Sequence, residues 1–228
     1  MSVSSQTNSV TSGEFLEIAS FIDDGSIARV RSGLPLLIET YTPGDMPQTL
    51  QNLGAEIGEP YIEPRESPFI VQSIRPEADA PDQSSNSYAD ELRLHTENPY
   101  EELEPDFLLI GCTANTEKAV TLIADPNRAL NALSEHIRKR LQEPRFSILE
   151  AGKFALAAGR SRTVIVHNVP ITKVAGDGVN DFHIDFEATT ARGLYQDALD
   201  QFEYVCRSIS QEIIMKPGDV LVLPNQRV

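Results

Sequence analysis

The seven residues Leu94-His95-Thr96-Glu97-Asn98-Pro99-Tyr100 decide how the rest of the chain is interpreted. They place an imidazole and a carboxylate two positions apart, and side chains at positions i and i+2 of a β-strand share one face. If residues 91–97 form a strand, His95 and Glu97 point together into one cavity. Two of the three ligands of a 2-His-1-carboxylate iron(II) site need this arrangement. The spacing therefore makes His95 and Glu97 candidate metal ligands.

Composition limits the class of protein. A chain of 228 residues with 40% hydrophobic and 7% aromatic residues is typical of one sizeable globular domain. The formal net charge of −15 argues against nucleic acid or an anionic membrane as a partner. Residues 1–12 are polar and predict a flexible arm ahead of a single domain over 13–228. The chain shows no signal-peptide pattern and no apolar stretch near the ~20 residues that span a bilayer.

The two cysteines each lie in an apolar run. Cys112 occurs in LLIGCTA and Cys206 in FEYVCRS, with no spacing that suggests pairing. Both are expected to be buried free thiols, and a reducing, cytoplasmic location follows as the default.

The hydrophobic pattern predicts many short strands and a few helices. Apolar residues at helical spacing predict helices over 12–22, 46–55, 124–144 and 191–210. Short apolar or alternating runs predict strands over 32–41, 69–76, 91–97, 106–114, 118–124, 146–150, 162–172, 182–188 and 220–223. Residues 78–89 are expected to form a polar loop. This succession favours a mostly β fold with flanking helices (α+β), of the double-sheet jelly-roll type.

Residues 182–188 alternate between apolar and polar side chains. The apolar face of the predicted strand is formed by Phe182, Ile184 and Phe186. The opposite face carries His183, Asp185 and Glu187. His183 is therefore the one other histidine expected near acidic groups, and it is a weaker candidate for a metal ligand. His136 is expected to be solvated on its helix, and His167 is expected to be structural.

Two stretches resemble a known family. LRLHTENPYEELEPDFLLIGCTAN (92–115) and KAVTLIAD (118–125) are similar to the clavaminate synthase-like oxygenases of the taurine dioxygenase superfamily, which include arginine and asparagine hydroxylases. The resemblance implies a double-stranded β-helix that uses Fe(II), 2-oxoglutarate and O₂. It implies that His95 and Glu97 are the first two iron ligands and that Thr121 binds a 2-oxoglutarate carboxylate. Without the resemblance, Thr121 is an ordinary β-branched strand residue.

The same resemblance gives Asp185 and Glu187 a role. In the amino-acid hydroxylases, a pair of acids two positions apart on the equivalent strand holds the cationic side chain of the substrate. Carboxylates in these positions favour a basic amino acid through charge-assisted hydrogen bonds. The alternative is that both acids lie on the solvent face of an edge strand.

The sequence over 216–227, KPGDVLVLPNQR, resembles the family segment that leads to the distal iron ligand. In the family, this segment runs from a Gly-Asp pair through a buried strand to Asn-x-Arg. The histidine lies two positions after that arginine. This sequence ends at Val228, so that histidine, and an arginine for the second 2-oxoglutarate carboxylate, are expected beyond it. The 13–228 domain is then expected to lack its last strands, to expose strand edges and apolar surface, and to be poorly soluble or to self-associate.

Two interpretations remain open. The first is an Fe(II)/2-oxoglutarate-dependent dioxygenase that hydroxylates an amino acid or a small molecule derived from one. The second is a non-catalytic, shortened relative that keeps the scaffold and binds a small molecule or a partner chain.

Overall fold

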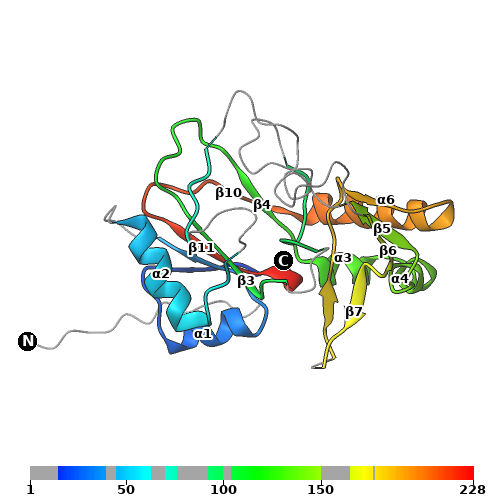
Figure 1. Ribbon diagram of the computed structural model, residues 1–228, viewed down its shortest axis with the longest axis horizontal. Coiled ribbons are helices and arrows are strands. Elements are labelled where there is room, and N and C mark those ends of the chain that lie inside the picture. Colours follow the sequence, from blue (N-terminus) through cyan, green and yellow to red (C-terminus); the bar gives the residue numbers. More distant parts are fainter. Residues whose placement is uncertain are drawn as a thin grey trace, which may run out of the picture.

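The computed structural model describes residues 15–39, 45–62, 70–75, 92–99, 104–149, 165–176 and 178–228. Figure 1 shows these residues arranged in two halves, with the C-terminus between them. One half contains a sheet covered by the first two helices. The other contains the remaining helices and several short strands. None of the helices in these ranges combines the length and apolarity needed to cross a membrane.

A four-stranded sheet forms the centre of the first half. Its strands, in spatial order, are β1 (Glu17–Ala19), β2 (Leu36–Ile38), β11 (Val220–Pro224) and β3 (Phe107–Gly111). β1 and β2 are parallel, whereas β11 is antiparallel to both of its neighbours, β2 and β3. The run Val220, Leu221 and Val222 is buried on both faces, as expected for an apolar strand at the centre of a sheet. The turn before it contains Gly218 in a left-handed conformation, with φ of 102°.

Alternate residues of β11 pack on opposite sides of this sheet. Val220 and Val222 face a cluster that includes helices α1 (Asp24–Arg31) and α2 (Met46–Ile57). Leu221 faces the other way, toward the ribbon of β4 (Thr121–Ile123) and β10 (Gln211–Ile213). The sheet is therefore a middle layer between two helices and a two-stranded ribbon (Figure 1).

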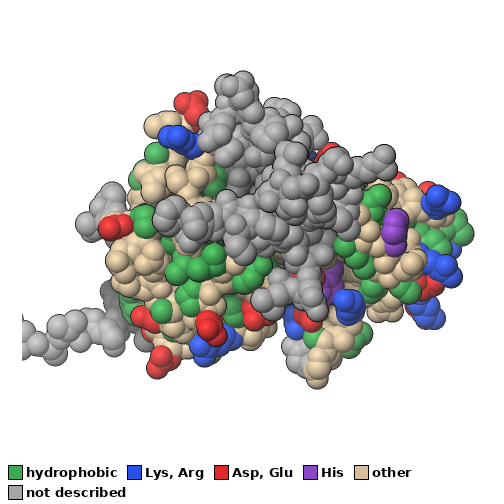
Figure 2. Space-filling model, in the orientation of Figure 1, with side chains coloured by type: hydrophobic (Ala, Val, Ile, Leu, Met, Phe, Trp, Pro, Cys, Tyr) green, Lys and Arg blue, Asp and Glu red, His purple; other side chains and the backbone are tan. Residues whose placement is uncertain are grey.

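The second half is built around helix α6 (Leu194–Ile209). Two short helices, α3 (Pro126–Ala132) and α4 (Glu135–Leu141), pack against it. The strands form a sheet in the order β6 (Ile165–Val169), β5 (Phe146–Leu149) and β9 (Thr189–Thr190), and a hairpin of β7 (Thr172–Val174) and β8 (Asn180–Phe182). Of the basic side chains at the right-hand edge of Figure 2, the lower ones lie where Figure 1 places α4 and the upper ones lie near the end of α6.

Aromatic packing joins α6 to the strands. The Phe202 ring lies 5.7 Å from the Phe182 ring and 5.8 Å from the Phe186 ring, measured between centroids. Cys206, one turn further along α6, is 3% exposed, and burial raises the pKa of its thiol to about 12. Cys112 is also a buried free thiol, so the prediction for both cysteines is confirmed.

The predicted helix over 12–22 is wrong. Residues 17–19 form β1, and the first helix begins only at Asp24. Backbone pairing with β2 outweighs the helical spacing of the apolar residues, and Ile18 is left 60% exposed. Asp23 caps the start of α1, because its carboxylate accepts the Ser26 N–H at 2.7 Å.

The helix predicted over 124–144 is two helices. Asp125 caps the first and Pro126 opens it, but the chain becomes extended at Leu133 and Ser134. The break leaves backbone carbonyls without helical partners. The Arg138 guanidinium donates to the Asn131 and Leu133 carbonyls at 3.3 and 3.1 Å, which compensates for part of this loss.

The strands predicted over 69–76, 91–97 and 182–188 are also wrong in the described residues. Residues 70–75 are irregular, and only position 95 of 92–97 makes a β-bridge. In 182–188 the apolar side chains are buried as predicted, yet the strand ends at Phe182. The chain turns because the Asp185 carboxylate accepts the Glu187 and Ala188 N–H groups at 2.8 and 3.1 Å. The predicted loop over 78–89 and the arm over 1–12 lie outside the described residues.

The other elements are confirmed with narrower limits. The predicted helices over 46–55 and 191–210 correspond to α2 and α6. The remaining predicted strands correspond to β2, β3, β4, β5, β6 with β7, and β11. The fold class α+β is thereby supported, while the described strands form four separate small sheets without closing into one barrel.

The packing of α6 yields a stability prediction. Replacing Phe202 with alanine removes a ring that is 1% exposed and leaves a cavity beside Phe182 and Phe186, so it should cost about 3–5 kcal/mol. The control is Tyr204→Ala on the same helix, where the side chain is 75% exposed and the change should stay within about 0.5 kcal/mol. Urea unfolding of both variants measures the difference. Equal losses would show that α6 does not pack through Phe202.

Candidate functional site

The segment 92–99 carries His95 and Glu97 and is mostly irregular. Its one β-bridge pairs His95 with Asp185, so the regular strand expected from the sequence is absent. Burial nevertheless alternates, because His95 is exposed, Thr96 is buried and Glu97 is half-buried. The two candidate ligands therefore flank a residue that points into the protein.

Thr96 attaches this segment to the second half of the molecule. Its N–H donates to the Ile184 carbonyl at 2.7 Å, and its hydroxyl accepts the Ile184 N–H at 3.1 Å. The hydroxyl also donates to the Ile184 carbonyl at 3.3 Å. Thr96 is 3% exposed, so these bonds are shielded from water. The bonds between Thr96 and Ile184 therefore position His95 and Glu97, which do not belong to a regular β-strand.

The orientation of His95 is set by a backbone carbonyl. Its Nδ1 lies 2.8 Å from the Arg93 carbonyl oxygen. A carbonyl only accepts hydrogen bonds, so this contact requires a proton on Nδ1, and in the neutral imidazole the lone pair is then on Nε2. The side chain is exposed, and no hydrogen bond to Nε2 is present among the described residues. This is the tautomer in which a histidine binds a metal through Nε2.

The side chain of Arg93 is held in turn by α6. Its Nε donates to Glu203 Oε1 at 2.8 Å, and its Nη2 contacts Glu203 Oε2. A weaker ion pair joins Arg93 Nη1 to Glu187 at 3.4 Å. Hydrogen bonding to Glu203 raises the pKa of Arg93 above its usual value. The carbonyl that orients His95 therefore belongs to a residue fixed by a two-point ion pair.

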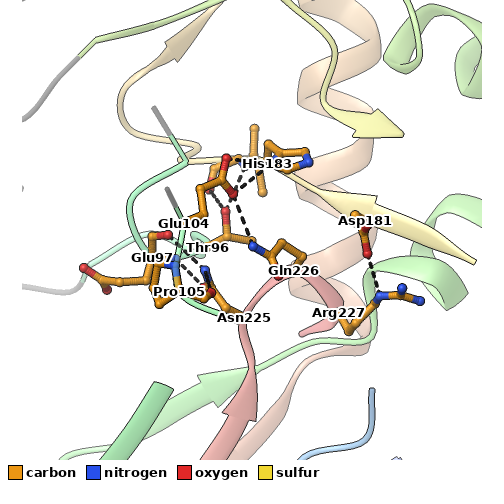
Figure 3. A network of polar contacts seen from close by, with 10 residues as sticks. Thr96, Glu97, Glu104, Pro105, Asp181, His183, Asn225, Gln226 and Arg227 are labelled. Atoms are coloured by element: carbon orange, nitrogen blue, oxygen red, sulfur yellow. Dashed lines mark hydrogen bonds and ion pairs between the residues drawn. The ribbon is translucent and has the colours of Figure 1, made fainter. Parts of the chain in front are cut away.

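The backbone of Glu97 is held from the other side by Asn225 (Figure 3). Asn225 Oδ1 accepts the Glu97 N–H at 2.6 Å, and Asn225 Nδ2 donates to the Glu97 carbonyl at 3.0 Å. The same Nδ2 donates to the Pro105 carbonyl at 2.9 Å. In Figure 3 the Glu97 carboxylate extends away from Asn225. Asn98, the next residue, has a left-handed φ of 52°, so the chain turns directly after Glu97.

Asn225 belongs to a short 3-10 helix, η1 (Asn225–Arg227), that contacts three segments. Gln226 Nε2 donates to Glu104 Oε2 at 3.5 Å, and Arg227 Nε pairs with Asp181 at 2.7 Å (Figure 3). Glu104 also contacts the His183 ring nitrogen Nδ1 at 2.8 Å. The C-terminal turn of the described chain therefore lies at the meeting point of both halves.

Among the described residues, one of the other histidines, His183, contacts a carboxylate. His183 pairs with Glu104 rather than with the acids at 185 and 187. His136 is exposed beside Ser134, and His167 is exposed beside Ser147. Across the described ranges, no three His, Cys, Asp or Glu side chains come together as a metal-binding group.

The remaining sequence-predicted residues occupy different surroundings. Asp185 lies opposite His95 in the bridge, with one oxygen committed to the turn at 186–188. Glu187 is exposed and forms an ion pair with Arg93. Thr121 opens β4 opposite Ile213 of β10, half-buried in the other half of the fold. The structure thus brings Asp185 to His95 and places Thr121 in a separate sheet.

Sequence reasoning did not find Arg93, Glu203 or the role of Asn225. Arg93 and Glu203 are 110 positions apart, and Glu97 and Asn225 are 128 apart. The one signal for Asn225 was its place in the Asn-x-Arg pattern, which carries no information about its partner.

Comparison with known proteins agrees with the resemblance seen in the sequence. L-lysine 3-hydroxylase of Catenulispora acidiphila is 29% identical over 148 residues, which are 64% of this chain and 41% of that protein. A solved asparagine oxygenase, in complex with Fe(II), a hydroxyasparagine and succinate, matches with a TM-score of 0.55 and 23% identity. That match covers 62% of this chain and 44% of the other.

A second fold match is more extensive. The non-heme iron oxygenase OrfP, in complex with Fe and alpha-ketoglutaric acid, has a TM-score of 0.70 at 20% identity, over 90% of this chain and 72% of that chain. The chain therefore spans less than half the length of the lysine hydroxylase and the asparagine oxygenase that it matches.

The profile of the Taurine catabolism dioxygenase TauD, TfdA family matches residues 32–228. This range includes the segment 92–99, the β11 strand and η1. The match covers most of the sequence, and the chain belongs to the TauD/TfdA dioxygenase family.

Proposed function

We propose that this chain carries the metal-binding part of an Fe(II)- and 2-oxoglutarate-dependent oxygenase that hydroxylates an amino acid or a derivative of one. The observation that carries the proposal is the orientation of His95. Its Nδ1 lies 2.8 Å from the Arg93 carbonyl oxygen, the residue is exposed, and Glu97 is two residues away. Family membership and the similarity to an amino-acid hydroxylase support the same reaction class.

His95 Nε2 and the Glu97 carboxylate are the groups that would hold the iron. Imidazole and carboxylate are the donor types that non-heme iron(II) sites use, so the residues fit the ion chemically. Within the described residues, no third His, Cys, Asp or Glu side chain joins these two as a metal-binding group. When bound, iron and 2-oxoglutarate supply the activation of O₂, and the protein supplies orientation and the exclusion of water.

Thr121 is proposed to bind a 2-oxoglutarate carboxylate. Its hydroxyl is a hydrogen-bond donor at the start of a short strand, where the backbone is fixed by pairing with β10. The proposal follows from the family resemblance around residues 118–125. It requires that the sheet containing Thr121 and the segment 92–99 face one cavity, as in a double-stranded β-helix, which we propose as the complete fold.

Asp185 and Glu187 are proposed to receive the cationic end of the substrate, with unequal contributions. Glu187 already forms an ion pair with Arg93. Asp185 uses one oxygen to accept two backbone N–H groups and lies across the β-bridge from His95. A cationic substrate would compete with Arg93 for Glu187 but not for Asp185. Asp185 is therefore the stronger candidate.

The alternative is a non-catalytic relative that keeps the scaffold and binds a small molecule or a partner chain. The observation in its favour is that, within the described residues, no third metal-binding side chain joins His95 and Glu97. The two functions differ in one measurable property, because only the oxygenase needs Fe(II) and 2-oxoglutarate to bind together.

Iron binding gives the first functional test. Anaerobic addition of Fe(II) and 2-oxoglutarate should produce a visible metal-to-ligand charge-transfer band, and His95→Ala should abolish it by removing one protein ligand. His167→Ala is the matched control, because His167 is an exposed histidine bonded only to Ser147 among the described residues, and it should keep the band. A full band in His95→Ala would exclude His95 as a ligand, and no band in the parent chain would favour the non-catalytic relative.

Substrate charge gives the second test. Asp185→Asn keeps the oxygen that caps the turn but removes the charge, so binding of L-lysine or L-arginine should weaken by about 10-fold or more. Glu187→Gln should have a smaller effect, since Arg93 already neutralises that carboxylate. Isothermal titration calorimetry measures binding by both variants. Norleucine, whose side chain carries no charge, is the control ligand. An unchanged affinity in Asp185→Asn would remove Asp185 from the substrate site.

A further inference from the structure

We infer that Asn225 is a positioning residue for Glu97, setting the direction of the proposed iron-binding carboxylate without contacting the metal. The inference rests on the proposed function only in treating Glu97 as a ligand. The contacts themselves are three hydrogen bonds between 2.6 and 3.0 Å from one buried side-chain amide. Asn225 is 4% exposed, so water does not compete for these bonds.

The Asn225 amide takes the place of a missing neighbouring strand. In a hydrogen-bonded pair of an antiparallel ladder, each residue donates its N–H to the carbonyl of the facing residue. Its own carbonyl accepts the N–H of that same residue. Glu97 makes this same pair of bonds with Asn225 Oδ1 and Nδ2. Because both backbone groups of Glu97 are engaged by one rigid planar amide, the peptide planes on either side of its Cα are fixed. The direction of the Cα–Cβ bond, from which the side chain with the carboxylate extends, follows from them.

Asn225 is itself held on a rigid support. It directly follows β11, whose last residue, Pro224, pairs with Phe107. The Asn225 N–H donates to the Asp106 carbonyl at 2.8 Å, and its side chain also binds the Pro105 carbonyl. The amide therefore connects β11 to the backbone of Glu97. Only asparagine has both a donor and an acceptor at this reach, since aspartate lacks the donor.

The test is hydrogen–deuterium exchange combined with Co(II) titration of the full chain. Asn225→Ala removes all three bonds, so the Glu97 amide should exchange at least about 10-fold faster, and Co(II) should bind about 10–100-fold more weakly. Arg227→Ala is the matched control, because it removes the ion pair to Asp181 from the same turn and has no bond to the Glu97 backbone among the contacts described. It should leave the exchange rate and the Co(II) affinity close to those of the parent.

A second variant separates positioning from simple loss of hydrogen bonding. Asn225→Gln keeps the amide but displaces it by one methylene, so it preserves bonding capacity while moving Glu97. Its Co(II) affinity should lie between those of the parent and Asn225→Ala, and it serves as the main variant if the alanine form does not fold. Parent-like affinity in Asn225→Gln would overturn the positioning role.

Two further outcomes would overturn the inference. One is an unchanged exchange rate of the Glu97 amide in Asn225→Ala. The other is faster exchange with unchanged Co(II) affinity, which would make the bonds purely structural. If the parent chain itself does not bind Co(II), the proposed function fails, and the exchange rate alone still decides whether Asn225 fixes Glu97.

Discussion

The segment 92–99 depends on side chains from distant parts of the chain for its conformation. It has one bridge, at His95, and little further strand pairing in the described residues. Thr96 binds Ile184, and Asn225 binds Glu97, so one attachment comes from each half of the fold. A buried segment without a regular ladder is stable only when its backbone groups find such partners. The position of both candidate ligands is therefore a property of the tertiary structure.

This arrangement ties the candidate site to the hydrophobic packing of both halves of the fold. Asn225 is the residue after β11, whose central residues are buried between the two helices and the β4–β10 ribbon. On the other side, Arg93 is held by Glu203 on α6, the helix that packs through Phe202. Loosening either core would shift one ligand relative to the other, because His95 and Glu97 are oriented from opposite sides. Each core thus contributes to the geometry of the site as well as to stability.

The sequence predicted those elements whose signals are local. β11, α2 and α6 were found from apolar runs, periodicity and flanking turns, and His95 and Glu97 were identified as a pair from their spacing and the family resemblance. The prediction failed where distant partners decide the outcome. Residues 17–19 pair with β2 despite helical spacing, and Asp185 bends a segment whose alternation indicated a strand. The Asn225–Glu97 contact spans 128 positions, so no local pattern reveals it.

The account is tested most directly by an anaerobic crystal structure of the chain with Mn(II) and 2-oxoglutarate. We expect Mn(II) to be bound by His95 Nε2 and the Glu97 carboxylate, with the His95 Nδ1 contact to the Arg93 carbonyl retained. A metal bound at another place, or through His95 Nδ1 with that contact broken, would contradict the account.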